Sequence, residues 1–139
     1  MYNKFMSKTA ELLKTKKIRP TLTRLAIGEI FFKSFDHPSA EELVLKLKKV
    51  SPYISRATIY NTLELFVKKG LAVRRALKTG GSIYDPVVSK HHHFVDRTSG
   101  KIYDIPWELA KLPQKINLPG FEVEDYYLVI TGKKNKEEK

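Results

Sequence analysis

The sequence predicts an α+β protein in which an N-terminal winged helix-turn-helix is followed by a small α/β domain. Helical periodicity with cap residues fills roughly the first half of the chain, and a Gly-rich hairpin followed by strand-forming residues fills the rest. The net charge of +11 lies entirely in residues 1–90, which carry 18 Lys and Arg against 7 Asp and Glu. Residues 91–139 carry 8 of each kind, so the two parts are expected to meet different partners.

The first two helices are separated by a basic connector. Residues 5–15 form a lysine-rich helical stretch, and the connector ends at Pro20, which disfavours helical backbone at Arg19. Thr21 is a suitable cap for a second helix that ends before residues 36–38. Its apolar stripe is Ile27, Ile30, Phe31 and Phe35.

Two further helices begin at serine caps. Ser39 and Glu42 form a capping box for the third helix. Its expected buried face is Leu43, Val44, Leu47 and Val50. Ser55 caps a fourth helix that runs to about Lys69 and stops at Gly70. Its expected core face is Ile59, Leu63, Phe66 and Val67.

A change of periodicity after the fourth helix predicts a β-hairpin. Residues 72–77 and 82–85 are short extended runs joined by the Gly-rich turn 78–81. Helices that end in a basic hairpin are typical of a winged helix-turn-helix, which we expect over residues 1–85. Residues 86–90 are expected to be a hinge.

Residues 91–132 are expected to form the second domain. The predicted elements are strands at 91–95, 101–105 and 121–130 and a short helix within 106–115. So small a sheet is too thin to be stable alone, which predicts a dimerisation domain that pairs with a second copy of the chain. Residues 133–139 look like a disordered charged tail.

Composition excludes several classes of protein. The absence of cysteine excludes disulfides, thiolate nucleophiles and thiolate-bound zinc, so nitrogen and oxygen atoms must hold any metal. No apolar run approaches the roughly 20 residues of a membrane span, and we expect a cytoplasmic protein with no membrane partner. The basic first part favours a nucleic acid partner; the alternative is a solubilising surface.

The exposed side of the fourth helix is a candidate surface for reading DNA. Its candidate contacts are Arg56, Thr58, Tyr60 and Asn61. Asn bonds bidentately to adenine and an aromatic edge contacts thymine methyl groups, which predicts A·T-rich sites. The alternative is that Tyr60 packs on a neighbouring helix and Asn61 is merely solvated.

Two groups of cations flank this helix and are candidate contacts to phosphate or to the minor groove. The group near the second helix is Lys14, Lys16, Lys17, Arg19 and Arg24. The group on the expected wing is Arg74, Arg75 and Lys78. Each cation taken singly is equally explained as a solvated surface charge.

A run of three histidines is the core of a candidate metal site. His91 and His93 are two residues apart, so they share one face of a strand, whereas His92 faces the other way and is assigned a structural role. The full candidate set is His37, Asp85, His91, His93 and Asp104. Such nitrogen and oxygen ligands suit Fe²⁺, Mn²⁺ or Zn²⁺ better than Mg²⁺ or Ca²⁺. The alternative is that these are ordinary turn, loop, cap and strand-end residues.

Four segments in a fixed order carry a resemblance to a known family. They are residues 37–43 (HPSAEEL), 54–63 (ISRATIYNTL), 84–86 (YDP) and 91–94 (HHHF). With them the chain resembles the ferric uptake regulator family from about Lys14 to Gly132. The resemblance implies that the five candidate ligands form a regulatory metal site between DNA-binding and dimerisation domains. Asp rather than Glu at position 104 resembles the peroxide-sensing PerR branch.

The sequence also departs from the family pattern. Thr23 stands where the family's Arg-x-Thr-x-Gln-Arg segment has Gln, and no His follows Phe121, so a further metal site is absent. Residues 96–99 (DRTS) replace a Cys-x-x-Cys pair, which excludes a structural four-cysteine zinc. The dimer is then expected to depend on apolar residues, namely Phe121, Val123, Leu128 and Ile130.

The resemblance implies a homodimeric, metal-dependent transcriptional repressor that binds a palindromic, A/T-rich operator in double-stranded DNA. It further implies peroxide sensing through Fe²⁺-catalysed oxidation of His37 or His91, with Mn²⁺ supporting DNA binding at lower peroxide sensitivity. Because divalent affinity generally favours Zn²⁺ over Fe²⁺ and Mn²⁺, purified protein can carry Zn²⁺ in place of the physiological metal. The alternatives are an iron- or manganese-responsive uptake regulator without peroxide sensing, a non-haem iron enzyme, and a winged-helix architectural protein without a metal site.

Overall fold

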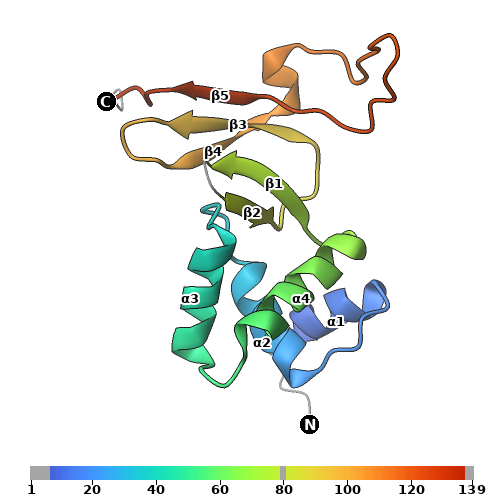
Figure 1. The fold of residues 1–139 in the computed structure, drawn as a ribbon, viewed down its shortest axis with the longest axis vertical. Helices are drawn as coiled ribbons and strands as arrows, with labels where there is room; N and C mark the ends of the chain where they lie inside the picture. Colours follow the sequence, from blue (N-terminus) through green and yellow to red (C-terminus); the bar gives the residue numbers. More distant parts are fainter. Residues whose placement is uncertain (1–6, 79–80, 137–139) are drawn as a thin grey trace. The chain divides into compact units, whose positions relative to one another are not determined.

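A computed structural model describes residues 7–78 and 81–136 (Figure 1). The chain divides into an N-terminal unit, Met1–Val88, and a C-terminal unit, Ser89–Lys139. The N-terminal unit contains helices and a hairpin, and the C-terminal unit contains a three-stranded sheet. The predicted α+β class is therefore confirmed. Among the described residues, no helix combines the length and apolar character that a membrane span requires.

Side-chain caps define where the helices of the N-terminal unit begin. The helices are α1 (Ser7–Thr15), α2 (Leu22–Phe31), α3 (Ala40–Val50) and α4 (Arg56–Lys68). Thr21, Ser39 and Ser55 each accept a hydrogen bond from the backbone N–H three residues later, which confirms the predicted caps. Residues 5 and 6 of the expected first helix lie outside the described residues.

The core of the N-terminal unit is built on the apolar faces of these helices. Phe66 of α4 lies at its centre, with its ring centroid 6.0 Å from that of Phe31 and 5.2 Å from that of Phe32. The prediction that Phe35 and Val50 are buried was wrong, because Phe35 is 64% exposed and Val50 is 69% exposed. Phe35 lies beyond the end of α2, and Val50 is the last residue of α3, so neither helix carries its side chain into the core.

The hairpin after α4 is formed by β1 (Val73–Lys78) and β2 (Gly81–Asp85). The strands pair antiparallel, with Arg75 opposite Ile83. The predicted turn at residues 78–81 includes residues 79–80, which lie outside the described part of the chain. An isolated bridge between Ser39 and Ile83 attaches β2 to the segment before α3. This bridge holds the loop that contains His37 beside the hairpin.

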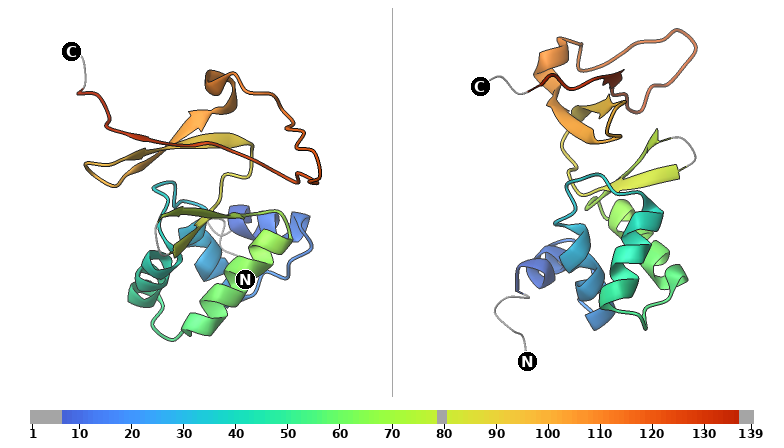
Figure 2. Two further views of the ribbon diagram at one scale, coloured as in Figure 1. Left: turned by 45° about the horizontal axis from the view of Figure 1, so that its top comes forward. Right: turned by 90° about the vertical axis from the view of Figure 1, so that its left-hand side faces the viewer.

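The C-terminal unit is a sheet with strand order β4-β3-β5. Its elements are β3 (His91–Asp96), β4 (Ile102–Pro106), the single 3₁₀ turn η2 (Trp107–Ala110) and β5 (Val129–Gly132). The expected helix within 106–115 is thus shorter than predicted, and the expected strand at 121–130 is largely wrong. Residues 111–128 form a long connection without helix or strand (Figure 2). The parallel pairing with β3 is assigned from Val129 onward, and before it the Leu128 carbonyl accepts a hydrogen bond from the His93 N–H at 3.0 Å.

An aromatic cluster packs one face of this sheet. The His92 ring stacks on Trp107 with centroids 4.1 Å apart, and Tyr126 meets Trp107 edge-on at 5.0 Å. Lys90 places its Nζ 4.3 Å from the Trp107 ring centroid and 4.6 Å from that of Tyr126. The Leu128 N–H donates to His92 Nδ1 at 2.9 Å, and burial lowers the pKa of the His92 imidazole. His92 is therefore a packing residue that faces away from its two neighbours.

Candidate functional site

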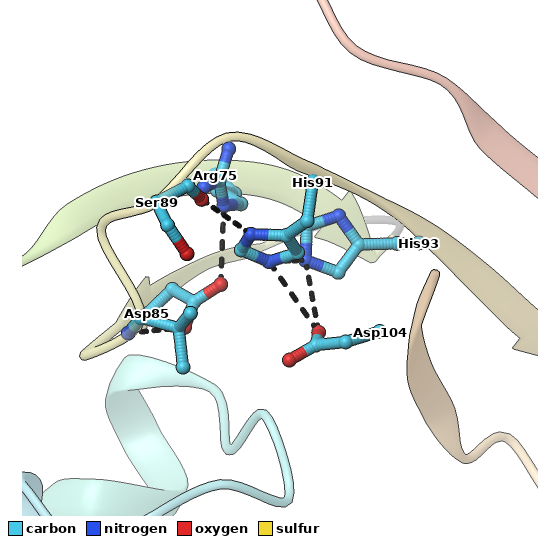
Figure 3. A network of polar contacts seen from close by, with 7 residues as sticks. Arg75, Asp85, Ser89, His91, His93 and Asp104 are labelled. Atoms are coloured by element: carbon cyan, nitrogen blue, oxygen red, sulfur yellow. Dashed lines mark hydrogen bonds and ion pairs between the residues drawn. The ribbon is translucent and has the colours of Figure 1, made fainter. Parts of the chain in front are cut away.

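Three candidate ligands meet within the C-terminal unit. His91 and His93 lie on the same face of β3 because strand side chains alternate, and both are buried. Asp104 of β4 is the register partner of His93, so its carboxylate lies beside the two rings. Figure 3 shows the three side chains pointing toward one another. The Nε2 atoms of the two histidines are 3.0 Å apart, and Asp104 Oδ1 is 3.4 and 3.5 Å from them.

These separations and this chemistry fit a divalent cation. Ligand atoms about 2.1 Å from a shared metal ion, at angles between octahedral and tetrahedral values, are about 3.0–3.4 Å from one another. His91 Nδ1 lies 2.6 Å from the Ser89 carbonyl oxygen, which accepts the Nδ1–H and leaves Nε2 with a lone pair. Three ligand atoms therefore face one point: His91 Nε2, His93 Nε2 and Asp104 Oδ1. A positive charge at that point would stabilise them.

The other two candidate ligands, His37 and Asp85, belong to the N-terminal unit. His37 is buried in the loop between α2 and α3 and has φ 55°, a backbone conformation that is uncommon for a residue with a side chain and occurs often at functional sites. Asp85, at the end of β2, is buried as well. The ligand atoms of these two residues lie within 4.8 Å of each other. The loop and the hairpin, joined at the Ser39 bridge, therefore bring an imidazole and a carboxylate together.

Both oxygens of the Asp85 carboxylate accept hydrogen bonds within the N-terminal unit. Arg75 Nε donates to Oδ2 at 3.2 Å (Figure 3), and the Val87 N–H donates to Oδ1 at 2.9 Å. Arg75 is only 5% exposed, so its expected role as a wing cation that contacts phosphate is wrong. Its position opposite Ile83 in the hairpin register turns the side chain to the face that also carries Asp85. Nothing is described of the Lys78 side chain, the third expected wing cation.

Three of the predicted DNA contacts surround one hollow on the N-terminal unit. This hollow has a volume of about 300 Å³ and lies between the start of α2 and the exposed side of α4. Its lining residues are Thr21, Thr23, Arg24, Thr58, Asn61, Thr62 and Leu65. Of these, the sequence reasoning singled out Arg24, Thr58 and Asn61. It missed Thr21 and Thr23 as candidate contacts, although they flank the start of α2, where phosphate is favoured.

Two further predicted contacts, Arg56 and Tyr60, are held by a glutamate. Arg56 forms an ion pair with Glu41 of α3, and the Tyr60 hydroxyl donates to the same carboxylate at 2.7 Å. The hydrogen bond from Arg56, followed by that from Tyr60, lowers the pKa of Glu41. Tyr60 is partly buried against the core, so its ring does pack on the neighbouring helices. Sequence reasoning missed Glu41, because nothing in the local pattern pairs residues 15 positions apart.

On the wing, Arg74 is exposed and forms an ion pair with Glu64 of α4. The Tyr84 hydroxyl donates to the same carboxylate at 2.6 Å, and burial raises the pKa of Tyr84 to about 12, so this donor keeps its proton at neutral pH. The remaining predicted contacts are exposed around the end of α1 and the connector, namely Lys14, Lys16, Lys17 and Arg19. Arg24, Arg56 and Arg74 thus lie on or beside α4, as a nucleic-acid-binding surface requires.

Comparisons with known proteins identify the family of the chain. The model of the ferric uptake regulator family matches residues 15–131. The ferric uptake regulation protein of Rhizobium leguminosarum bv. viciae is 34% identical over 137 residues, 96% of either chain. The peroxide operon regulator of Bacillus subtilis is 32% identical over 131 residues, 91% of this chain and 89% of the relative. The solved ferric uptake regulator from Pseudomonas aeruginosa with manganese aligns with a TM-score of 0.68 at 26% identity and covers 92% of this chain and 98% of that one.

Proposed function

The chain belongs to the ferric uptake regulator family, whose members are metal-responsive transcription regulators and not enzymes, and on that basis we propose that it is a peroxide-sensing, metal-dependent repressor. It acts as a homodimer on double-stranded DNA with a palindromic, A/T-rich operator. The observation that carries the proposal is the convergence of His91, His93 and Asp104 at the spacing of metal ligands, in a chain with a second buried pair of ligands.

The regulatory metal is held by His37, Asp85, His91, His93 and Asp104, and its physiological form is Fe²⁺ or Mn²⁺. The first two ligands belong to the N-terminal unit and the other three to the C-terminal unit. All five are satisfied together only in one orientation of the units, so the metal favours that conformer. Coupling of this kind is typically about 1–3 kcal/mol, or roughly 5- to 150-fold in DNA affinity. The manganese in the solved relative supports this choice of metal.

Dimerisation involves the C-terminal unit. Phe121 is 76% exposed in the single chain, and Leu128, Val129 and Ile130 are each 37–40% exposed on or beside the edge strand β5. An apolar edge strand is a liability in a monomer, and a second copy of the chain covers it. Two N-terminal units carried by one dimer then meet the two halves of a palindrome.

DNA is read by Tyr60 and Asn61 in the first half of α4, and phosphates are held by Lys14, Lys16, Arg19, Arg24, Arg56, Thr58 and Arg74. Asn61→Ala should therefore relax base preference by about 1–3 kcal/mol at one position while leaving the salt dependence of affinity unchanged. Lys16→Ala is the matched control, because loss of a phosphate contact weakens all sequences alike and lowers the salt slope by about one. Each Mn²⁺-loaded variant can be used to select duplexes from a random pool. This selection distinguishes a loss of base preference from a uniform loss of affinity. A uniform loss of affinity in Asn61→Ala would show that Asn61 reads no base.

Peroxide sensing rests on Asp104 and on the similarity to the peroxide operon regulator. Fe²⁺ in the site would activate hydrogen peroxide for attack on a neighbouring imidazole. Overall, the peroxide is reduced to water, and the ring of His37 or His91 is oxidised by two electrons and gains one oxygen atom. An altered imidazole is a poorer ligand, so the unit that carries it is released from the DNA-binding orientation. No cysteine is present to sense peroxide instead.

Mass spectrometry of peptides after brief peroxide treatment tests this function. In the Fe²⁺-loaded protein we expect one added oxygen on the peptide that contains His37 or His91, together with loss of DNA binding. Mn²⁺-loaded protein treated in the same way is the control and should stay unmodified. If the Fe²⁺-loaded protein also stays unmodified and still binds DNA only when metal is present, peroxide sensing is wrong. The chain is then an uptake regulator, as the name of the Rhizobium relative indicates for that protein.

A further inference from the structure

Arg75 and Asp85 form a buried ion pair within the N-terminal unit. The side chain of Arg75 is 5% exposed and that of Asp85 is 1% exposed, with Nε 3.2 Å from Oδ2. Ion pairs elsewhere on this unit, such as Lys33 with Glu29, are far more exposed. A carboxylate removed from water needs a counter-charge, and losing one partner of a buried pair is strongly destabilising. The metal-free protein therefore needs Arg75 at this position.

We propose that Arg75 is a resident counter-charge that sets the metal affinity of the regulatory site. Without metal, Arg75 neutralises Asp85 and keeps it in place. When a divalent cation arrives, the fixed guanidinium opposes it, so the site responds only at a higher metal concentration. This inference rests on the proposed function, because Asp85 is a metal ligand only there.

Arg75 and the Val87 N–H hold different oxygens of the Asp85 carboxylate. Arg75 donates to Oδ2, and the Val87 N–H donates to Oδ1. The Val87 N–H holds Oδ1 independently of Arg75, so removal of the arginine does not leave the carboxylate without orientation.

Charge therefore decides the sign of the effect. Loss of an orienting partner typically weakens metal binding by about 10- to 100-fold. In Arg75→Gln that loss is small, because the Gln amide still donates hydrogen bonds. The variant removes the Coulomb repulsion between the buried guanidinium charge and the divalent ion. This repulsion energy is twice that between two unit charges at the same distance. Arg75→Gln should therefore bind metal more tightly, whereas Arg75→Lys keeps the charge and should stay near the wild type.

Calorimetric titration with Mn²⁺ and thermal unfolding with and without Mn²⁺ test this role on the full chain. We expect Arg75→Gln to bind Mn²⁺ at least about tenfold more tightly and, without metal, to melt at least about 4 °C lower than the wild type. With Mn²⁺ bound, the melting temperatures of Arg75→Gln and the wild type should be equal. A variant that folds only in the presence of Mn²⁺ would also support the counter-charge role. Arg75→Lys should bind within about threefold of the wild type, and so should Lys33→Gln, in which an exposed ion pair is removed instead.

The outcomes separate this inference from the proposed function. If the wild type binds Mn²⁺ and Arg75→Gln binds it equally or more weakly, Arg75 does not oppose the metal and the inference is wrong. The inference is also wrong if Arg75→Gln stays unfolded in the presence of Mn²⁺. It is wrong as well if Arg75→Lys, which keeps the positive charge, binds Mn²⁺ as tightly as Arg75→Gln is expected to. If the wild type and Asp104→Ala both fail to bind Mn²⁺, the proposed function itself has failed.

Discussion

Replacing His37 with alanine should abolish the stimulation of DNA binding by Mn²⁺. His37 is buried in the N-terminal unit, where it and Asp85 are the only ligands proposed to connect that unit to the metal. With the imidazole gone, Asp85 alone connects the N-terminal unit to an ion held by His91, His93 and Asp104, and we expect this single carboxylate, which also bonds to Arg75, to be too weak a connection to favour one orientation. The expected loss is the whole coupling, roughly 5- to 150-fold in affinity. A gel shift with and without Mn²⁺, using a duplex selected by the wild type, measures it.

Asp36→Ala is the matched control for this variant. Asp36 is adjacent in sequence and exposed, and its carboxylate pairs with Lys46 at 3.5 Å on the surface, so its removal should leave the response to Mn²⁺ intact. Asp104→Ala should lose the response as completely as His37→Ala, although Asp104 belongs to the other unit. Normal stimulation in His37→Ala would remove this residue from the metal site and leave the two units without the proposed connection.

Trp107→Ala should give the largest loss of stability in the C-terminal unit. The indole is 5% exposed and lies between the His92 ring and Tyr126, with Lys90 above it. Truncation of a buried Trp costs about 3–5 kcal/mol, and this unit has no cysteine-bound zinc to hold it together. Because His92 is part of β3, the same change should loosen the strand that carries His91 and His93.

Hydrogen exchange of the β3 amides measures this loss, since protection reports the free energy of opening of the strand. Leu109→Ala is the matched control: Leu109 lies in the same turn, η2, but is 69% exposed, so it should change protection by no more than about 0.5 kcal/mol. Trp107→Phe should recover part of the stability because it keeps an aromatic ring against His92. Wild-type protection of β3 in Trp107→Ala would mean that the aromatic cluster does not stabilise the sheet.

Local signals in the sequence were sufficient to predict where the helices begin and that His91 and His93 share one face of a strand. The caps at Thr21, Ser39 and Ser55 act within three residues, so they are visible without knowledge of the fold. The shared face of His91 and His93 follows in the same way from strand alternation. Asp104 was placed correctly beside His93 because a short turn joins two neighbouring strands.

Features that depend on distant pairing were not predictable. Residues 121–128 have strand-like composition, but the structure assigns no strand to them, and composition alone does not supply the distant pairing that a strand needs. Arg75 looked like its neighbour Arg74, yet the hairpin register exposes one and buries the other against Asp85. The partners Glu41 and Glu64 lie on other elements than the arginines they bind, so no local spacing reveals them.

A crystal structure of the Mn²⁺-loaded full chain, with the ion located by its anomalous scattering, tests the central claim most directly. We expect one ion per chain, bound by His37 and Asp85 from the N-terminal unit and by His91, His93 and Asp104 from the C-terminal unit, each at about 2.0–2.3 Å. An ion bound by the three C-terminal ligands alone, with His37 and Asp85 turned away from it, would contradict the account.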